Sequence, residues 1–146
     1  MSTSASFSSS PVRELNFELL IMRLACSLPF IYHGAAILFG AFGGPGPHNF
    51  AAFMKMPVIV GYLVGLAQFA GGIAILIGAF FRVGAVCVII VMLGAIFLVH
   101  APHGYNLANN GMEFALTELL LSFGLLLAGP GKFSLAAILP GPLQKL

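Results

Sequence analysis

The sequence predicts an all-α integral membrane protein, built as a single bundle of four membrane-spanning helices. The first observation is composition: of 146 residues, 60% are hydrophobic and only 7% are charged, whereas a soluble domain carries about 25% charged residues. Six Lys/Arg and four Asp/Glu cannot form a water-facing surface for a chain of this size, so the outer surface must face lipid. The second observation is that four apolar stretches reach the ~17–25 residues that a spanning helix needs.

These stretches define the expected helices and their connections. Pro57 suits the first turn of a helix, where its missing N–H costs nothing. Phe81 and Arg82 leave room only for a tight turn, so the helices on either side of it are expected to be antiparallel neighbours. The four helices are expected at about 17–40, 57–80, 82–99 and 112–128.

The remaining segments complete the expected organisation. Residues 1–16 are rich in serine and are expected to form a flexible tail. Residues 17–129 form the membrane domain, and residues 130–146 form a tail whose Pro and Gly residues prevent the last helix from continuing far.

Basic residues predict the orientation of the chain. Four of them fall on one side of the membrane, namely Arg13, Arg82, Lys132 and Lys145, whereas Lys55 lies alone on the other. By the positive-inside rule both termini are expected to be cytoplasmic, in a bacterial-type inner membrane. Arg23 is expected to extend toward the same surface, or to pair with Glu18 there.

Polar side chains within the apolar stretches are the candidate functional residues, because such groups are costly in lipid. Gln68 shares one helical stripe with Gly61, Gly65 and Gly72, and small residues mark the face where membrane helices approach closely. Gln68 is therefore expected to face the protein interior. The candidate ligand-binding residues, all expected in the outer half of the bundle, are His33, Gln68, Glu118, Glu113 and His100.

These side chains allow a functional and a structural interpretation. An apolar pocket with a few hydrogen-bond donors and a group that exchanges protons suits a quinone, and His33, Gln68 and Glu118 are of the right types. Equally, Gln68 can be an interhelical hydrogen-bonding residue, and His33 and Glu118 can form a structural pair. No nucleophile–base pattern is visible, so we expect no catalytic residues, and any chemistry comes from a bound lipophilic molecule or a partner subunit.

Other sites are not expected. Pro102 interrupts helical geometry between His100 and His103, which disfavours a metal site. Cys26 and Cys87 stand alone in separate apolar stretches and are expected to be packing residues, although their spacing allows a bridge. No covalently bound cofactor is expected, and without a basic stripe no nucleic acid is expected either.

An ordered series of short motifs runs along most of the apolar part of the chain, from about residue 23 to 137. Its members are Arg23-Leu24, Tyr32-His33-Gly34, Leu38-Phe39-Gly40, Gln68-Phe69-Ala70-Gly71-Gly72, Gly78-Ala79-Phe80-Phe81-Arg82, Val99-His100 with Gly104, Asn110-Gly111-Met112-Glu113 and Gly129-Pro130-Gly131-Lys132-Phe133-Ser134-Leu135. This series resembles the DoxX family of small four-helix membrane proteins. The family pattern commonly has an acid where Gln68 stands, a lysine where Ile37 stands and an aspartate where Ala136 stands.

The resemblance implies a membrane subunit associated with a quinone-linked oxidoreductase or a respiratory-type electron-transfer system. Because an amide replaces the family's acid at Gln68, hydrogen bonding rather than proton transfer is expected there. The alternative is a non-catalytic accessory subunit of a larger membrane complex, favoured by the small extramembrane mass and the glycine-rich helix faces. In both cases the expected partners are lipid and other membrane subunits.

Overall fold

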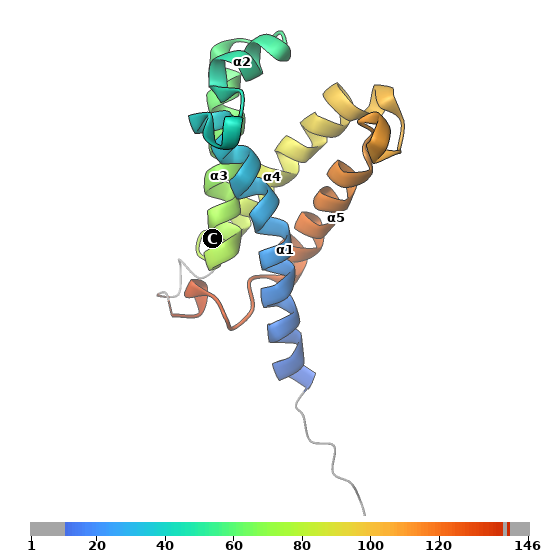
Figure 1. Cartoon of the computed structure of the whole chain (residues 1–146). Coiled ribbons are helices and arrows are strands. Elements are labelled where there is room, and N and C mark those ends of the chain that lie inside the picture. Colours follow the sequence, from blue (N-terminus) through green and yellow to red (C-terminus); the bar gives the residue numbers. More distant parts are fainter. Residues whose placement is uncertain (1–10, 139, 141–146) are drawn as a thin grey trace, which may run out of the picture.

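The computed structural model describes residues 11–138 and 140, and within these residues it contains helices and loops but no strand (Figure 1). The helices are α1 (Pro11–Phe39), α2 (Gly46–Phe53), α3 (Val58–Ile77), α4 (Phe81–Ala95), continued by a π-helical turn (Ile96–His100), and α5 (Glu113–Ala128). Short 3₁₀ turns lie at Ala41–Gly43, Ala101–His103, Leu107–Asn109 and Leu135–Ile138.

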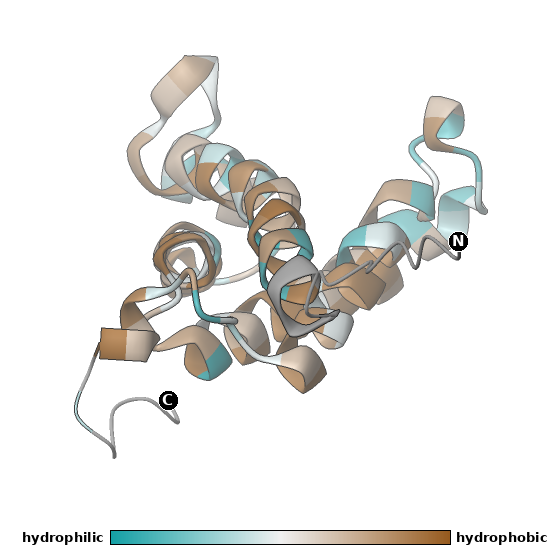
Figure 2. Ribbon diagram, turned by 90° about the horizontal axis from the view of Figure 1, so that it is seen from below, coloured by the Kyte–Doolittle hydropathy of each residue, from teal (hydrophilic) through white to brown (hydrophobic). Residues whose placement is uncertain are grey.

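Among the residues that the structure describes, three helical stretches are long and apolar enough to cross a membrane: Leu15–Phe39, Val58–Ile77 and Phe81–His103. α5 has 16 residues, or about 24 Å of helix, so it is shorter than the expected fourth span and returns beside α4. Side chains such as Leu28, Ile90 and Phe97 are more than half exposed. Figure 2 shows the apolar colouring along the helices. The chain is therefore an integral membrane protein whose helices contact lipid.

The first helix begins earlier than expected. α1 starts at Pro11, six residues before position 17, and proline at the first helical position is preorganised for a helix. Residues 1–10 of the expected flexible tail lie outside the described residues, as do residue 139 and residues 141–146 of the C-terminal tail.

Close packing of α1 on α3 depends on glycine. A Cβ atom at Gly34 would lie 2.3 Å from the backbone nitrogen of Phe69, and one at Gly72 would lie 3.0 Å from that of Ile31. The backbones can approach this closely only because side chains are absent. The glycine stripe of α3 thus packs against its neighbours, as its spacing predicts.

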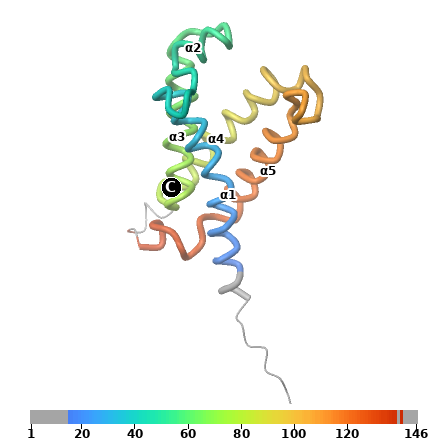
Figure 3. Tube along the Cα trace, viewed as in Figure 1, coloured from blue at the N-terminus to red at the C-terminus, as the bar shows by residue number. Residues whose placement is uncertain are grey.

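The bundle opens toward one end. α3 and α4 are joined by a tight turn in which Gly78 and Phe80 adopt left-handed conformations, with φ of 69° and 51°. From this turn, α4 and α5 run side by side away from α1 and α3, so that the two pairs diverge toward the end that carries α2 and the loop after α4 (Figures 1 and 3).

Arg23 closes the opposite end of the bundle, and here the expectation of an extended side chain or a Glu18 pair is wrong. The side chain is 1% exposed. Its guanidinium donates to main-chain oxygens at two places, the last turn of α3 and the segment after α5; the acceptors are Ile75, Leu76, Pro130 and Phe133. Carbonyls in the last turn of a helix have no partner within it, so Arg23 satisfies groups that would otherwise be costly in lipid.

The segment after α5 is packed rather than free as far as the structure describes it. The backbone N–H of Lys132 donates to Oδ1 of Asn16 at 2.7 Å, and that of Ala136 donates to the oxygen of Gly78 at 3.0 Å. Ala136 is 6% exposed. The expected tail therefore contributes, in its first part, to the closed end of the bundle.

Candidate ligand cavity at Gln68

Gln68 of α3 is 6% exposed and borders a cavity of about 220 Å³. Within the described part of the chain its amide forms no hydrogen bond. The other lining residues are apolar and come from α2, the segment after it, α3, α4 and the π-helical turn: Phe50, Met54, Met56, Val60, Val64, Ile90, Val91, Gly94, Ala95, Leu98 and Val99. The amide of Gln68 therefore has hydrogen-bonding groups that a ligand in the cavity could use.

Local features of the sequence create this cavity. α2 packs closely on α3 because Gly61 has no side chain: a Cβ there would lie 2.2 Å from the oxygen of Pro47. Gly94 of α4 faces open space, with nothing within 4 Å of where its Cβ would be. The π-helical turn that follows α4 supplies Leu98 and Val99, and such wider turns recur at functional sites.

A second cavity, the polar chamber, adjoins the first toward the loops and has a volume of about 260 Å³. The two cavities share Met54, Leu98 and Val99. The chamber adds Phe53 and three exposed polar residues, Lys55, His103 and Asn110. Nδ1 of His103 donates to the oxygen of Val99 at 2.8 Å, so Nε2 is the ring nitrogen available to a ligand or water.

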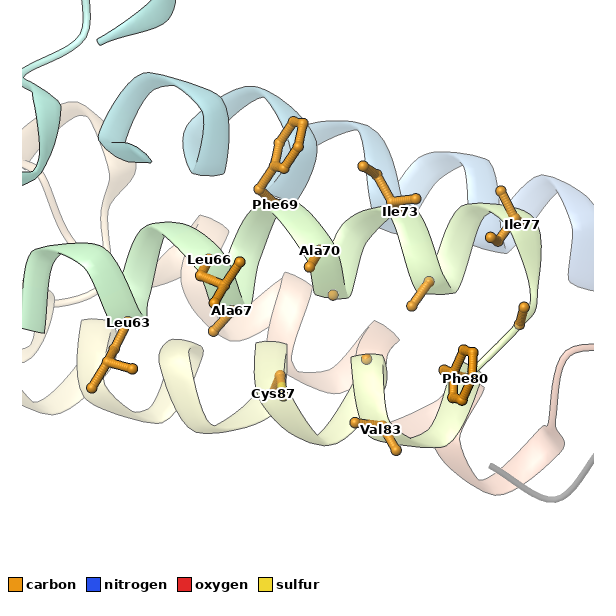
Figure 4. Close-up of a pocket in the computed structure, with 14 residues that line it drawn as sticks. Leu63, Leu66, Ala67, Phe69, Ala70, Ile73, Ile77, Phe80, Val83 and Cys87 are labelled. Carbon is orange, nitrogen blue, oxygen red and sulfur yellow. The ribbon is translucent and has the colours of Figure 1, made fainter. Parts of the chain in front are cut away.

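A third hollow, the α3–α4 groove, has a volume of about 600 Å³ (Figure 4). In the figure Ala67 and Ala70 project from α3 toward α4, and Cys87 projects from α4. All its lining side chains are apolar except for the thiol of Cys87; they are Leu63, Leu66, Ala67, Phe69, Ala70, Gly71, Ile73, Ala74, Ile77, Ala79, Phe80, Val83, Gly84 and Cys87.

Two of the predicted site residues lie away from the Gln68 cavity. His33 is exposed, and its ring contacts that of Tyr32 edge-on, with centroids 5.4 Å apart. Glu118 is 6% exposed, and its Oε2 is buried with no hydrogen-bond partner among the described residues. One turn further along α5, the hydroxyl of Ser122 lies 3.4 Å from the sulfur of Cys26. Neither His33 nor Glu118 lines the cavity.

The other two predicted residues hold the loop between α4 and α5. Oε2 of Glu113 accepts a hydrogen bond from the backbone N–H of Leu107 at 3.1 Å. Nδ1 of His100 donates to the oxygen of Asn110 at 2.8 Å. These bonds fix the wall of the polar chamber, since Asn110 belongs to it. The five candidates are thus not gathered in one site.

Sequence reasoning did not identify Met54, Lys55, Gly94 and His103 as residues of a common site. The available signals were the Met-Lys-Met run at 54–56, which is typical of an adaptable apolar surface, and an isolated glycine in α4. Among the described residues, no three His, Cys, Asp or Glu side chains are grouped so that they could hold a metal ion. Cys26 and Cys87 are both free thiols.

The fold and its apolar surface define a small all-helical integral membrane protein. The DoxX family model matches residues 18–101, more than half of the chain, so the protein belongs to the DoxX family. The matched part contains Gln68 and most of the residues around it. No curated protein and no solved structure matches the chain.

Proposed function

We propose that the protein is a membrane subunit of a quinone-linked oxidoreductase system and that it binds the quinone ring in the Gln68 cavity. The observation that carries the proposal is the Gln68 amide, nine-tenths buried, unpartnered within the described residues and bordering an apolar cavity. A quinone ring is apolar on its faces and carries two carbonyl oxygens, and the amide N–H groups of Gln68 can donate to one of them.

The size of the cavity supports a ring rather than a whole lipid. Its volume of about 220 Å³ is below the ~300–1,000 Å³ of pockets that enclose a drug-sized ligand. Val91 and Gly94 of α4 and Met54 of the segment after α2 line it. Methionine adapts to the shape of a flat ring, and Gly94 leaves space against α4.

In this proposal the protons and the electrons reach the quinone from different sources. Reduction of a quinone to a quinol takes up two electrons and two protons. An amide does not exchange protons at physiological pH, so the protons come through the adjoining polar chamber with Lys55 and His103. The electrons come from a partner oxidoreductase subunit. The positive-inside rule supports cytoplasmic termini, and with that orientation the polar chamber would lie on the outer side.

The test is the quinone content of protein purified in mild detergent from a bacterial membrane. We expect bound quinone in the parent and at least a fivefold lower content in Gln68→Met, which keeps the side-chain length but removes the amide, and in Gly94→Leu, which fills the cavity. Gly124→Leu is the matched control, because Gly124 on α5 also faces open space. The double variant His33→Ala/Glu118→Gln is expected to retain quinone, since neither residue lines the cavity.

Two results would overturn the proposal. One is a parent protein that contains no quinone and binds none when a short-chain quinone is added. The other is full retention of quinone by Gln68→Met. Loss of quinone in the His33/Glu118 variant alone would move the site to the α1–α5 side of the bundle.

A second function, an accessory subunit that packs within a larger membrane complex, is supported by the apolar faces outside the bundle. Phe97 and Leu127 are each 70% exposed, and membrane helices associate through such surfaces as well as contacting lipid through them. Native mass spectrometry after gentle solubilisation tests it. Co-purifying subunits in stoichiometric amount are expected, whereas a protein that runs only as a monomer or homodimer would exclude this function.

A further inference from the structure

We propose that the ligand is a prenylated quinone whose isoprenoid tail lies in the α3–α4 groove, while the ring oxygen opposite Gln68 faces the polar chamber. The inference rests on the proposed function and specifies its substrate class. It follows from how three hollows adjoin. The polar chamber shares three lining residues with the Gln68 cavity, and the apolar groove begins beside the cavity on α3, at Leu63, and extends to Ile77.

The Gln68 cavity and the groove follow the same seam between α3 and α4. On α3, Val64 and Gln68 border the cavity, and Ala67 and Gly71, each three residues further on, border the groove. On α4, Val91 borders the cavity, and Cys87, one turn away, borders the groove. Residues three or four apart are neighbours on a helix surface, so the two hollows adjoin although no residue lines both. In this proposal the tail crosses from one to the other at this point.

The chemistry of the groove suits a hydrocarbon chain. Its lining contains no charged side chain and no hydrogen-bonding side chain other than a thiol. The α3 residues along its length run from Leu63 to Ile77, a helix rise of about 21 Å. Small side chains border it, with Ala67, Ala70 and Gly71 on α3 and Gly84 on α4. An apolar groove of this length accepts an extended, branched hydrocarbon, whereas a polar substituent there would lose its hydrogen bonds.

The other end of the arrangement has the opposite chemistry. Lys55, His103 and Asn110 line the polar chamber. Lys55 and Asn110 can donate hydrogen bonds to an oxygen, whereas Nε2 of His103 can accept one, because Nδ1 already donates to Val99. A tail directed into that chamber would displace water from these groups without replacing its hydrogen bonds. The ring is therefore oriented with one oxygen toward Gln68, the other toward the chamber, and the tail toward the turn between α3 and α4.

The test compares two quinones with the same fully substituted ring, one bearing a tail of several isoprene units and one bearing a methyl group in its place. Affinities are measured with the full-length protein in one detergent and expressed as mole fractions in the detergent phase, because the tail itself partitions into micelles. In the parent, the tailed quinone is expected to bind at least tenfold more tightly. Ala70→Phe, which fills the groove from an exposed position, is expected to abolish this difference and to leave binding of the methyl quinone unchanged. Ala128→Phe, at an exposed position on α5 outside the groove, is the matched control.

Cys87 supplies an independent measurement. It lies partly exposed in the groove, whereas Cys26 is fully buried. A lipid-soluble maleimide is therefore expected to label Cys87 selectively, and the tailed quinone, but not the methyl quinone, is expected to slow the labelling at least fivefold.

The outcomes separate this inference from the proposed function. Equal affinities for both quinones, with methyl-quinone binding still dependent on Gln68, would overturn the tail assignment and leave the ring site intact. Absence of binding by either quinone would overturn both. Protection of Cys87 in native membranes that persists after quinone extraction and disappears when a co-purifying subunit is removed would show that the groove holds a partner helix instead, and would also overturn the inference.

Discussion

Nε of Arg23 donates a 2.9 Å hydrogen bond to the main-chain oxygen of Ile75, across 52 residues of sequence. Nη1 of the same guanidinium reaches the oxygens of Pro130 at 3.0 Å and Phe133 at 2.7 Å. One buried side chain thus joins α1, the end of α3 and the segment after α5. Arginine suits this role because its planar group directs five N–H donors outward in fixed directions.

Arg23→Lys is expected to lower the free energy of unfolding by about 3 kcal/mol or more. Each hydrogen bond to a charged group contributes roughly 1.5–3 kcal/mol, and the single ammonium group of lysine cannot reach all the carbonyl acceptors. Unfolding in mixed micelles with increasing SDS measures this. Trypsin should also cleave after Lys132 faster in the variant, since the segment loses its anchor. The control is Arg82→Lys, where an exposed guanidinium makes one 3.2 Å bond to Leu126. A loss at Arg23 no larger than at Arg82 would contradict the anchoring role.

Gly34→Ala is expected to destabilise the protein by about 1–3 kcal/mol, as overpacking does in close-packed interiors, because the new Cβ would meet the backbone of Phe69 at 2.3 Å. Gly124→Ala is the matched control. It also adds a methyl group to a helix but meets open space, so it should gain up to about 1 kcal/mol from helix propensity. The same unfolding measurement compares the two, and similar effects at both positions would show that α1 and α3 are not in backbone contact.

Local chemistry of the sequence was sufficient to predict the membrane class, the long helices and the burial of Gln68. High hydropathy directly predicts contact with lipid, and the spacing of Gly61, Gly65 and Gly72 predicts which face of the helix packs against its neighbours. It was not sufficient for Arg23, whose acceptors lie 52 to 110 residues away along the chain. The sequence of a single helix does not predict that backbone oxygens from two other segments will lie close to its arginine.

The five predicted site residues are not gathered in one place, for a geometric reason. His33 follows Cys26 by seven residues on the same stripe of α1, and Cys26 is fully buried against α5. From the sequence, His33 is expected to contribute to a ligand site with Gln68 and Glu118. However, α1 and α5 diverge toward the end of the bundle that carries α2 (Figure 3), and His33 is exposed. Angles between helices depend on packing over the whole bundle, which periodicity within one helix does not encode.

The orientation of the chain can be tested at Lys55. In a variant with Cys26 and Cys87 replaced by Ala, Lys55→Cys is expected to react with a membrane-impermeant maleimide added to intact cells. Lys55 is exposed and directly follows α2, which lies at the end of the bundle away from the turn between α3 and α4 (Figure 1). Arg82→Cys, at the other end, should react only after the cells are permeabilised. The reverse pattern would show that both termini lie outside and would contradict the positive-inside assignment.

Glu118 offers a test of whether a residue is retained for stability or for activity. Its Oε2 is buried without a hydrogen-bond partner among the described residues, and an unsatisfied buried polar group costs about 1–3 kcal/mol. Glu118→Met, which has similar length and no polar group to satisfy, is therefore expected to raise the free energy of unfolding by that amount. Glu118→Gln should change it little, because an amide at the same place remains unsatisfied. A less stable Glu118→Met protein would show instead that the carboxyl group has a stabilising partner. If Glu118→Met is more stable but the membrane complex loses electron transfer, the carboxyl group serves activity at a cost in stability, although it lies outside the Gln68 cavity.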